Sequence, residues 1–202
     1  MVILKILHYI MVYILIISYI KFNKNKKEMN IIYRTDKEGE QNIFGDEFVK
    51  NNKNNIELII NGNKSSLIEK CELRKGENNI KIIIKNKIKN LEKMFYECKS
   101  LININELKYL DTKDVNNFSY MFSKCSSLID IKGLENWNVS KGNKFSSMFN
   151  GCSSLIDIKG LENLNVSNGN NFEYMFCGCS SLLDMKPLQN WNVSKWKYNS
   201  LK

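Results

Sequence analysis

The chain has 202 residues, enough to bury a core in one or two domains, and its 43% hydrophobic and 25% charged content is that of a folded protein. The formal net charge is +9, but basic residues alternate with acidic ones along the whole chain, so no basic stripe could follow a phosphate backbone. The composition therefore argues against nucleic acid as a partner.

Residues 2–20 are almost continuously apolar, interrupted only by Lys5 and His8. This length is close to the roughly 20 residues that an α-helix needs to span a bilayer, and no cleavage pattern follows. Four lysines come directly afterwards, namely Lys21, Lys24, Lys26 and Lys27. We predict an uncleaved anchor with a basic flank over residues 1–27, and a membrane-associated, single-pass protein whose body lies in the cytosol by the positive-inside rule. The alternative is a misplaced start codon and no genuine anchor.

Residues 28–90 are predicted to form a small β-rich region or cap. Residues 56–60 run into Asn61-Gly62, a pair that readily takes the positive φ angles of a tight hairpin turn, and residues 66–68 would be the return strand. A second hairpin is predicted between residues 71–73 and 80–84, turning at Lys75-Gly76.

From residue 91 onward the sequence repeats every 27 residues. Each copy carries a Met-Phe pair, then a cysteine three residues after the Phe, then Ser-Leu. The four cysteines are Cys98, Cys125, Cys152 and Cys179. A fixed period in the twenties is typical of leucine-rich repeats, in which one strand and one helical piece form each unit. No single unit can bury its apolar face alone, whereas stacked units share a continuous core.

Two periodicities inside the repeat predict its elements. Phe118, Met121, Phe122 and Cys125 are spaced i, i+3, i+4 and i+7, which places them on one face of a short helix. In the following segment, residues 128–132, alternate side chains would share a face of a strand. The predicted helices are 91–97, 118–124, 145–151 and 172–178, and the predicted parallel strands are 101–105, 128–132, 155–159 and 182–186.

The predicted fold class for residues 91–202 is therefore an α/β solenoid, a leucine-rich-repeat-like array of four 27-residue strand-plus-short-helix units. The small β-rich region and an N-terminal hydrophobic helix would precede this array. The predicted core positions are Met121, Phe122, Leu128 and Ile131, together with their equivalents 27 and 54 residues on.

The motif Met-Phe-x-x-Cys-x-Ser-Leu, with Trp-Asn-Val-Ser at residues 137–140 and 191–194, resembles the BspA-type leucine-rich-repeat surface-protein family of bacteria and protists. The resemblance covers about residues 90–195 and rests on residue types that recur four times. It implies a right-handed solenoid with parallel strands and an adhesion or protein-binding role. It also makes the cell surface the alternative localisation.

The four periodic cysteines are predicted to form a structural ladder of free thiols. They lie on the buried face of the predicted helices, where a small and weakly polar side chain packs well. Equivalent atoms of stacked strands lie about 4.8 Å apart, too far for a disulfide of about 2.05 Å without distortion. No cysteines have the spacing of a zinc site with a histidine nearby, so we predict neither a metal nor another cofactor. Cys71 and Cys177 have no assigned role.

Charged residues recur with the same period, as Asp130, Asp157 and Asp184 and as Lys132, Lys159 and Lys186. In each predicted strand the Asp and the Lys are two residues apart, so both would project from the outward face. Stacking would then form a column of acids beside a column of bases. We predict either a solvated face that keeps the sheet soluble or the surface that recognises a partner.

No enzyme signature is found in the sequence. It contains no phosphate-binding loop and no Gly-x-Ser-x-Gly motif, and its only histidine, His8, lies in the apolar segment. We therefore predict a non-enzymatic protein-binding or adhesion-type module whose protein partner the sequence does not identify. The alternative is a purely structural remnant of a longer repeat array with no partner of its own.

Overall fold

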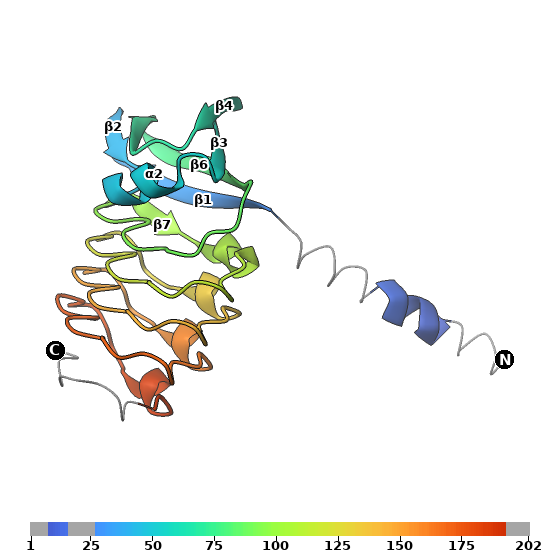
Figure 1. The fold of residues 1–202 in the computed structure, drawn as a ribbon. Coiled ribbons are helices and arrows are strands. Elements are labelled where there is room, and N and C mark those ends of the chain that lie inside the picture. The colour runs from blue at the N-terminus through green and yellow to red at the C-terminus, as the bar shows by residue number, and fades with distance from the viewer. Residues whose placement is uncertain (1–7, 16–26, 193–202) are drawn as a thin grey trace.

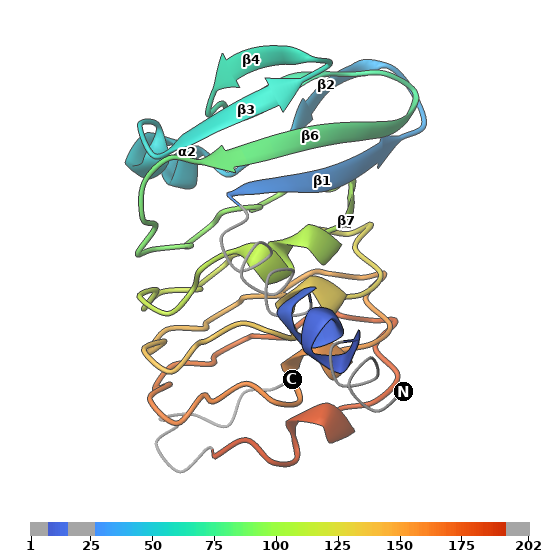
Figure 2. The ribbon, with the colours of Figure 1, turned by 90° about the vertical axis from the view of Figure 1, so that its right-hand side faces the viewer.

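The structure, a computed structural model, describes residues 8–15 and 27–192. A β-rich part lies at one end of a stack of chain turns, and the last turn lies at the other end (Figure 1, Figure 2). The strands are β1 (Glu28–Thr35), β2 (Gly39–Asn42), β3 (Ile56–Ile60), β4 (Asn63–Ser66), β5 (Lys70–Leu73), β6 (Gly76–Ile84) and β7 (Leu101–Asn103). The helices named here are α2 (Asp46–Asn52) and four 3₁₀ helices, η1 (Asn105–Tyr109), η2 (Lys132–Leu134), η3 (Lys159–Leu161) and η4 (Lys186–Leu188).

The β-rich part is built on a five-stranded sheet in the order β4-β3-β6-β1-β7, in which all pairs are antiparallel. Alternate residues of β1 and β6 are buried, as expected of a sheet with one face on a core. Strand β7 belongs to the first repeat and pairs with β1, while the Gly45 N–H donates to the Met94 carbonyl at 3.1 Å. The sheet therefore covers the first turn of the stack.

The turn of the first predicted hairpin is confirmed, although its return strand is β4 and not residues 66–68, and the second predicted hairpin is wrong. β3 and β4 pair from Ile60↔Asn63, and both residues of the connecting turn, Asn61 and Gly62, have positive φ angles. β5 and β6 do not pair with each other, because β5 pairs with β2 and β6 pairs with β1 and β3. The period-two pattern identified the strands but could not choose their partners.

The predicted fold class is wrong, and the first reason is that the predicted helices are not helical. Residues 118–125 form successive tight turns, in which the N–H groups of Met121, Ser123 and Cys125 each donate to the carbonyl three residues earlier. Tyr120 and Lys124 take positive φ angles of 57° and 64°, which an α-helix does not allow. The i, i+3, i+4, i+7 spacing therefore reflects a chain of turns with inward-facing apolar residues.

The second reason is that the predicted parallel sheet does not form. Of the four predicted strands, only the first contains a described strand, β7, and β7 pairs antiparallel with β1. At residues 128–132 and 155–159 only the isolated parallel bridge Asp130↔Asp157 is found. The chain enters η2 and η3 within each of these segments, which breaks the extended conformation that a sheet requires. The regular sheet of this protein is thus the antiparallel one.

Backbone hydrogen bonds connect successive turns, and those of the phenylalanine segment run towards the next turn. The N–H groups of Phe118, Tyr120 and Phe122 donate to carbonyls of the next turn at 2.9, 2.9 and 2.8 Å. The Trp137 and Trp191 indole N–H groups instead reach back to the preceding turn, to the Leu107 and Leu161 carbonyls at 2.8 and 3.0 Å. These bonds replace the intrahelical bonds that the prediction assumed, and they satisfy backbone groups that would otherwise be buried without partners.

Two ladders of phenylalanine rings form the centre of the stack. Phe122 and Phe149 stack with centroids 5.5 Å apart and planes 2° apart, and Phe149 and Phe176 repeat this at 5.5 Å and 7°. Phe44 of the β-rich part extends the ladder onto Phe95 at 5.4 Å. The predicted core positions are buried, except that the last pair, Leu182 and Met185, is only partly buried. The core register was therefore predicted correctly although the secondary structure was not.

The predicted membrane anchor is also overturned. Within residues 8–15 and 27–192, no helix is both long and apolar enough to cross a membrane. The described helix of the N-terminal segment covers residues 8–15, which rise about 12 Å against a hydrocarbon core of about 30 Å. The predicted single-pass, membrane-associated localisation is corrected accordingly. The rest of the predicted span over residues 2–20 lies outside the described residues.

Candidate binding surface

The recurring aspartates lie two residues before the start of each 3₁₀ helix and form Asx turns into it. Asp130, Asp157 and Asp184 each accept a hydrogen bond through Oδ1 from the backbone N–H two residues on, at 3.3, 2.8 and 2.8 Å. That N–H belongs to the lysine that begins η2, η3 or η4. Short acidic side chains commonly stabilise turns in this way. The aspartates therefore have a local structural role that the predicted strand face did not include.

Each lysine also pairs with the aspartate of its own turn. The Nζ–Oδ2 distances are 3.2 Å for Lys132–Asp130, 3.4 Å for Lys159–Asp157 and 3.6 Å for Lys186–Asp184. The lysine side chains are 71–82% exposed, so these pairs contribute little to stability. The structure thus brings the six predicted residues together as three pairs stacked along the turns. Their role in binding stays a prediction.

A column of exposed aliphatic residues lies beside these pairs, and the sequence analysis missed it. Ile129, Ile156 and Leu183, which we call the aliphatic column, are 49%, 42% and 82% exposed. Strand alternation would have placed Ile129 on the same face as Ile131, yet Ile131 is buried. One sequence signal could have revealed the aliphatic column. The apolar residues Leu128, Ile131, Leu134 and Trp137 recur at every third position, which indicates that these positions are buried and that Ile129 is not.

The backbone holds the aliphatic column in a fixed register. The Ile156 N–H donates to the Ile129 carbonyl at 2.9 Å, and the Leu183 N–H donates to the Ile156 carbonyl at 3.4 Å. Because the aspartates follow directly in sequence and Asp130 bridges to Asp157, the acidic groups stack in the same register. The resulting surface has an apolar strip with charged groups along one side.

Another ion-pair column crosses three turns. The Asp114 carboxylate accepts from Lys87 Nζ at 2.7 Å and from Lys141 Nζ at 2.6 Å, which joins the turns on either side of it. These hydrogen bonds to two ammonium groups lower the pKa of Asp114 far below its usual range. This column connects neighbouring turns electrostatically, whereas the Asp–Lys pairs of the binding surface stay within one turn.

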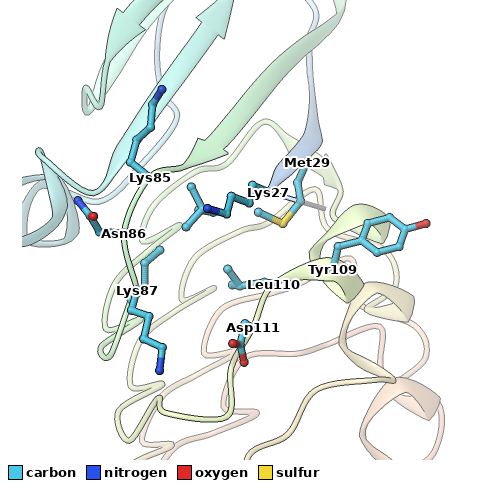
Figure 3. Close-up of a pocket in the computed structure, with 10 residues that line it drawn as sticks. Lys27, Met29, Lys85, Asn86, Lys87, Tyr109, Leu110 and Asp111 are labelled. Carbon is cyan, nitrogen blue, oxygen red and sulfur yellow. The ribbon is translucent and has the colours of Figure 1, made fainter. Parts of the chain in front are cut away.

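A pocket of about 420 Å³ lies between the β-rich part and the first turns (Figure 3). Met29, Ile88 and Leu110 supply buried apolar side chains to its lining, and lysines lie around it. Lys85 and Lys87 extend in opposite directions, and their Nζ atoms pair with Glu57 at 3.1 Å and with Asp114 (Figure 3). The charges around this pocket therefore do not converge on one point, as a catalytic or anion-binding site requires.

The periodic cysteines form a column of thiols in the core, in which Cys98, Cys125 and Cys152 are buried and Cys179 is partly buried. The Cys125, Cys152 and Cys179 Sγ atoms donate to phenylalanine carbonyls of the preceding turn at 3.0, 3.0 and 3.1 Å. Burial raises the pKa of Cys125 and Cys152 well above the usual value for a thiol and that of Cys179 to about 11. Such thiols are poor nucleophiles. Within the described residues, no group of three or more His, Cys, Asp or Glu side chains could hold a metal ion.

Comparison with known proteins gives one family. A family model described as "Mycoplasma protein of unknown function, DUF285" matches residues 63–191, which is more than half of the chain. The matched region begins at β4 and includes the stacked turns as far as Trp191. The chain belongs to this family. No curated protein and no solved structure matches the chain.

Proposed function

We propose that this member of the DUF285 family is a non-enzymatic protein-binding module. Its binding face would be the aliphatic column with the Asp–Lys pairs beside it. The observation that carries the proposal is the exposure of Ile129, Ile156 and Leu183 at the same position of three successive turns. Single exposed apolar residues are ordinary, but a contiguous apolar strip edged by charge is typical of a protein-interaction site.

The resemblance to the BspA-type surface proteins supports an adhesion-type role and is part of the same proposal. Like the protein-binding role, the adhesion-type role is a hypothesis about the repeat region. A rigid stack suits such a role, because side chains fixed by the backbone lose little conformational freedom when a partner binds.

A purely structural role is the second candidate. It is favoured by the observation that the three aspartates already cap their own turns and pair with their own lysines. Under this hypothesis the charged residues stabilise the turns and no partner is needed. The two candidate functions predict different results when only the lysines are substituted. The hydrogen bonds of the aspartates would remain, so the turns would keep their structure and only the binding of a partner would change.

The test is a charge-reversal triple variant, Lys132→Glu, Lys159→Glu and Lys186→Glu, used in affinity capture with cross-linking from the native source. A protein-binding module should capture its partner at a changed yield, which is lower if the partner pairs with the lysines and higher if it pairs with the aspartates. The matched control reverses Lys37, Lys53 and Lys75, which are exposed in the β-rich part and give the same change in net charge. Recovery of the same partners at the same yield by the folded test variant would favour the structural role.

A further inference from the structure

We infer that the aliphatic column binds an amphipathic α-helix of the partner, lying along the direction in which the turns are stacked. This inference rests on the proposed function and names the kind of partner. Its starting point is the spacing between turns. Ring centroids of stacked phenylalanines in successive turns lie 5.1 Å apart at Phe118–Phe145, 4.9 Å at Phe145–Phe172 and 5.5 Å at Phe122–Phe149, which gives a turn spacing close to 5 Å. The aliphatic column repeats once per turn.

This spacing matches a helix better than a strand. An α-helix rises about 1.5 Å per residue, so residues spaced i, i+4 and i+7 on one face advance about 6.0 and 10.5 Å and stay within about 1 Å of the successive aliphatic side chains. A strand places same-face side chains about 6.6–6.8 Å apart, so it would lose register by more than 1 Å at each turn. From Ile129 to Leu183, two turns on, the strand would be misaligned by about 3 Å.

The surroundings of the aliphatic column determine the charge of the partner helix. On one side Asp130 and Asp157 stack directly beside it, held by the bridge between their backbones. The residues two positions before the column, Ser127 and Ser154, are uncharged. A helix that docks here would therefore carry basic residues along the flank that faces the aspartates and uncharged residues along the other flank. Such a helix could compete with the exposed lysines for the carboxylates.

The size of the surface indicates the strength of binding. Three turns span about two turns of helix, so the contact is smaller than a standard interface and belongs to the weak, transient class. Removing one aliphatic side chain from the centre of so small a contact should weaken binding about tenfold or more.

The experiment uses the full chain and synthetic 18-residue peptides whose binding is measured by fluorescence anisotropy. The first peptide has leucines at helical spacing and lysines along one flank. The second has glutamates on that flank, and the third has the first peptide's composition arranged with strand alternation. The first peptide should bind most tightly, and Ile156→Ser should weaken its binding about tenfold. Asp157→Asn, which keeps a capping oxygen but removes the charge, should weaken it a few-fold.

Tyr174→Ser is the matched control, because Tyr174 is 55% exposed but lies outside the aliphatic column. It should leave binding unchanged. Equal or tighter binding of the strand-pattern peptide, or no effect of Ile156→Ser, would overturn the inference. A dimer of the chain that is abolished by Ile156→Ser would also overturn the inference, because a second copy of the chain would then occupy the aliphatic column. If capture of the native partner depends on Ile156 while no helical peptide binds, the helix inference fails and the proposed function stands. If neither capture of the native partner nor binding of the helical peptide depends on Ile156, the helix inference and the proposed function both fail.

Discussion

Truncation of Phe149 measures how much the ring ladder stabilises the stack. Phe149 is fully buried and stacks on two rings, Phe122 and Phe176, each 5.5 Å away. Deleting a buried phenylalanine ring costs about 3–5 kcal/mol, and each lost ring pair adds about 0.5–1.5 kcal/mol beyond area burial. Because its neighbours are held by hydrogen bonds between turns, the site cannot collapse easily. We expect Phe149→Ala to lower the free energy of unfolding by about 4–5 kcal/mol.

Phe176→Ala is the matched comparison, because Phe176 is 5% exposed and its only stacked partner among the described residues is Phe149. It should cost about 1–2 kcal/mol less than Phe149→Ala, through one fewer ring pair and a smaller cavity. Urea unfolding should be followed by circular dichroism and by tryptophan fluorescence, and coincident transitions justify a two-state treatment. A loss below about 1 kcal/mol for Phe149→Ala, or a larger loss for Phe176→Ala, would refute the packing argument.

Three other predictions follow from buried groups and charges. Cys152, whose thiol is buried, should resist alkylation in the native protein and react fully after unfolding without prior reduction; mass spectrometry that finds it in a disulfide would contradict this. Gly133→Ala should cost about 1–3 kcal/mol in urea unfolding, because the added Cβ would lie 2.0 Å from the Ile104 carbonyl oxygen; a neutral effect would mean that this turn can shift. Asp114 has a lowered folded-state pKa, so its contribution to stability is present above about pH 4 and is lost as the pH falls towards the folded pKa. Asp114→Asn should therefore reduce the acid-induced fall in Tm, an effect that high salt should diminish, and an identical pH profile would argue against these ion pairs.

The sequence predicted features that depend on spacing or on one strong local preference. The 27-residue period correctly identified which residues recur in the core, because stacked copies must bury equivalent side chains. Asn61-Gly62 identified a hairpin because few other pairs accept two positive φ angles in succession. The strand partners of β5 and β6 depend on contacts between distant segments of the chain, and the local sequence pattern carries no information about these contacts.

The conformation of the repeat could not be predicted from helical and strand periods. Its backbone takes positive φ angles at Tyr120 and Lys124, residues that show no special preference for them. The cost of about 1 kcal/mol at each such residue is offset by hydrogen bonds to the next turn, which exist only when the turns are stacked. The sequence did contain one indication of a positive φ angle at the position of Lys124. In later copies of the repeat this position is occupied by Gly151 and Gly178, and both have positive φ angles.

The same conformation explains why an exposed aliphatic column is found where strand alternation placed buried residues. Leu128 and Ile131 point inward, whereas the two residues between them are more exposed. One of these two positions is occupied by the aspartates, which accept hydrogen bonds from the backbone N–H groups that begin the 3₁₀ helices, so its side chain is determined by the fold. The other is occupied by Ile129, Ile156 and Leu183, which are 49%, 42% and 82% exposed. Since hydrogen bonds within the turns account for the aspartates, the aliphatic column is the part of this surface that we propose a partner binds.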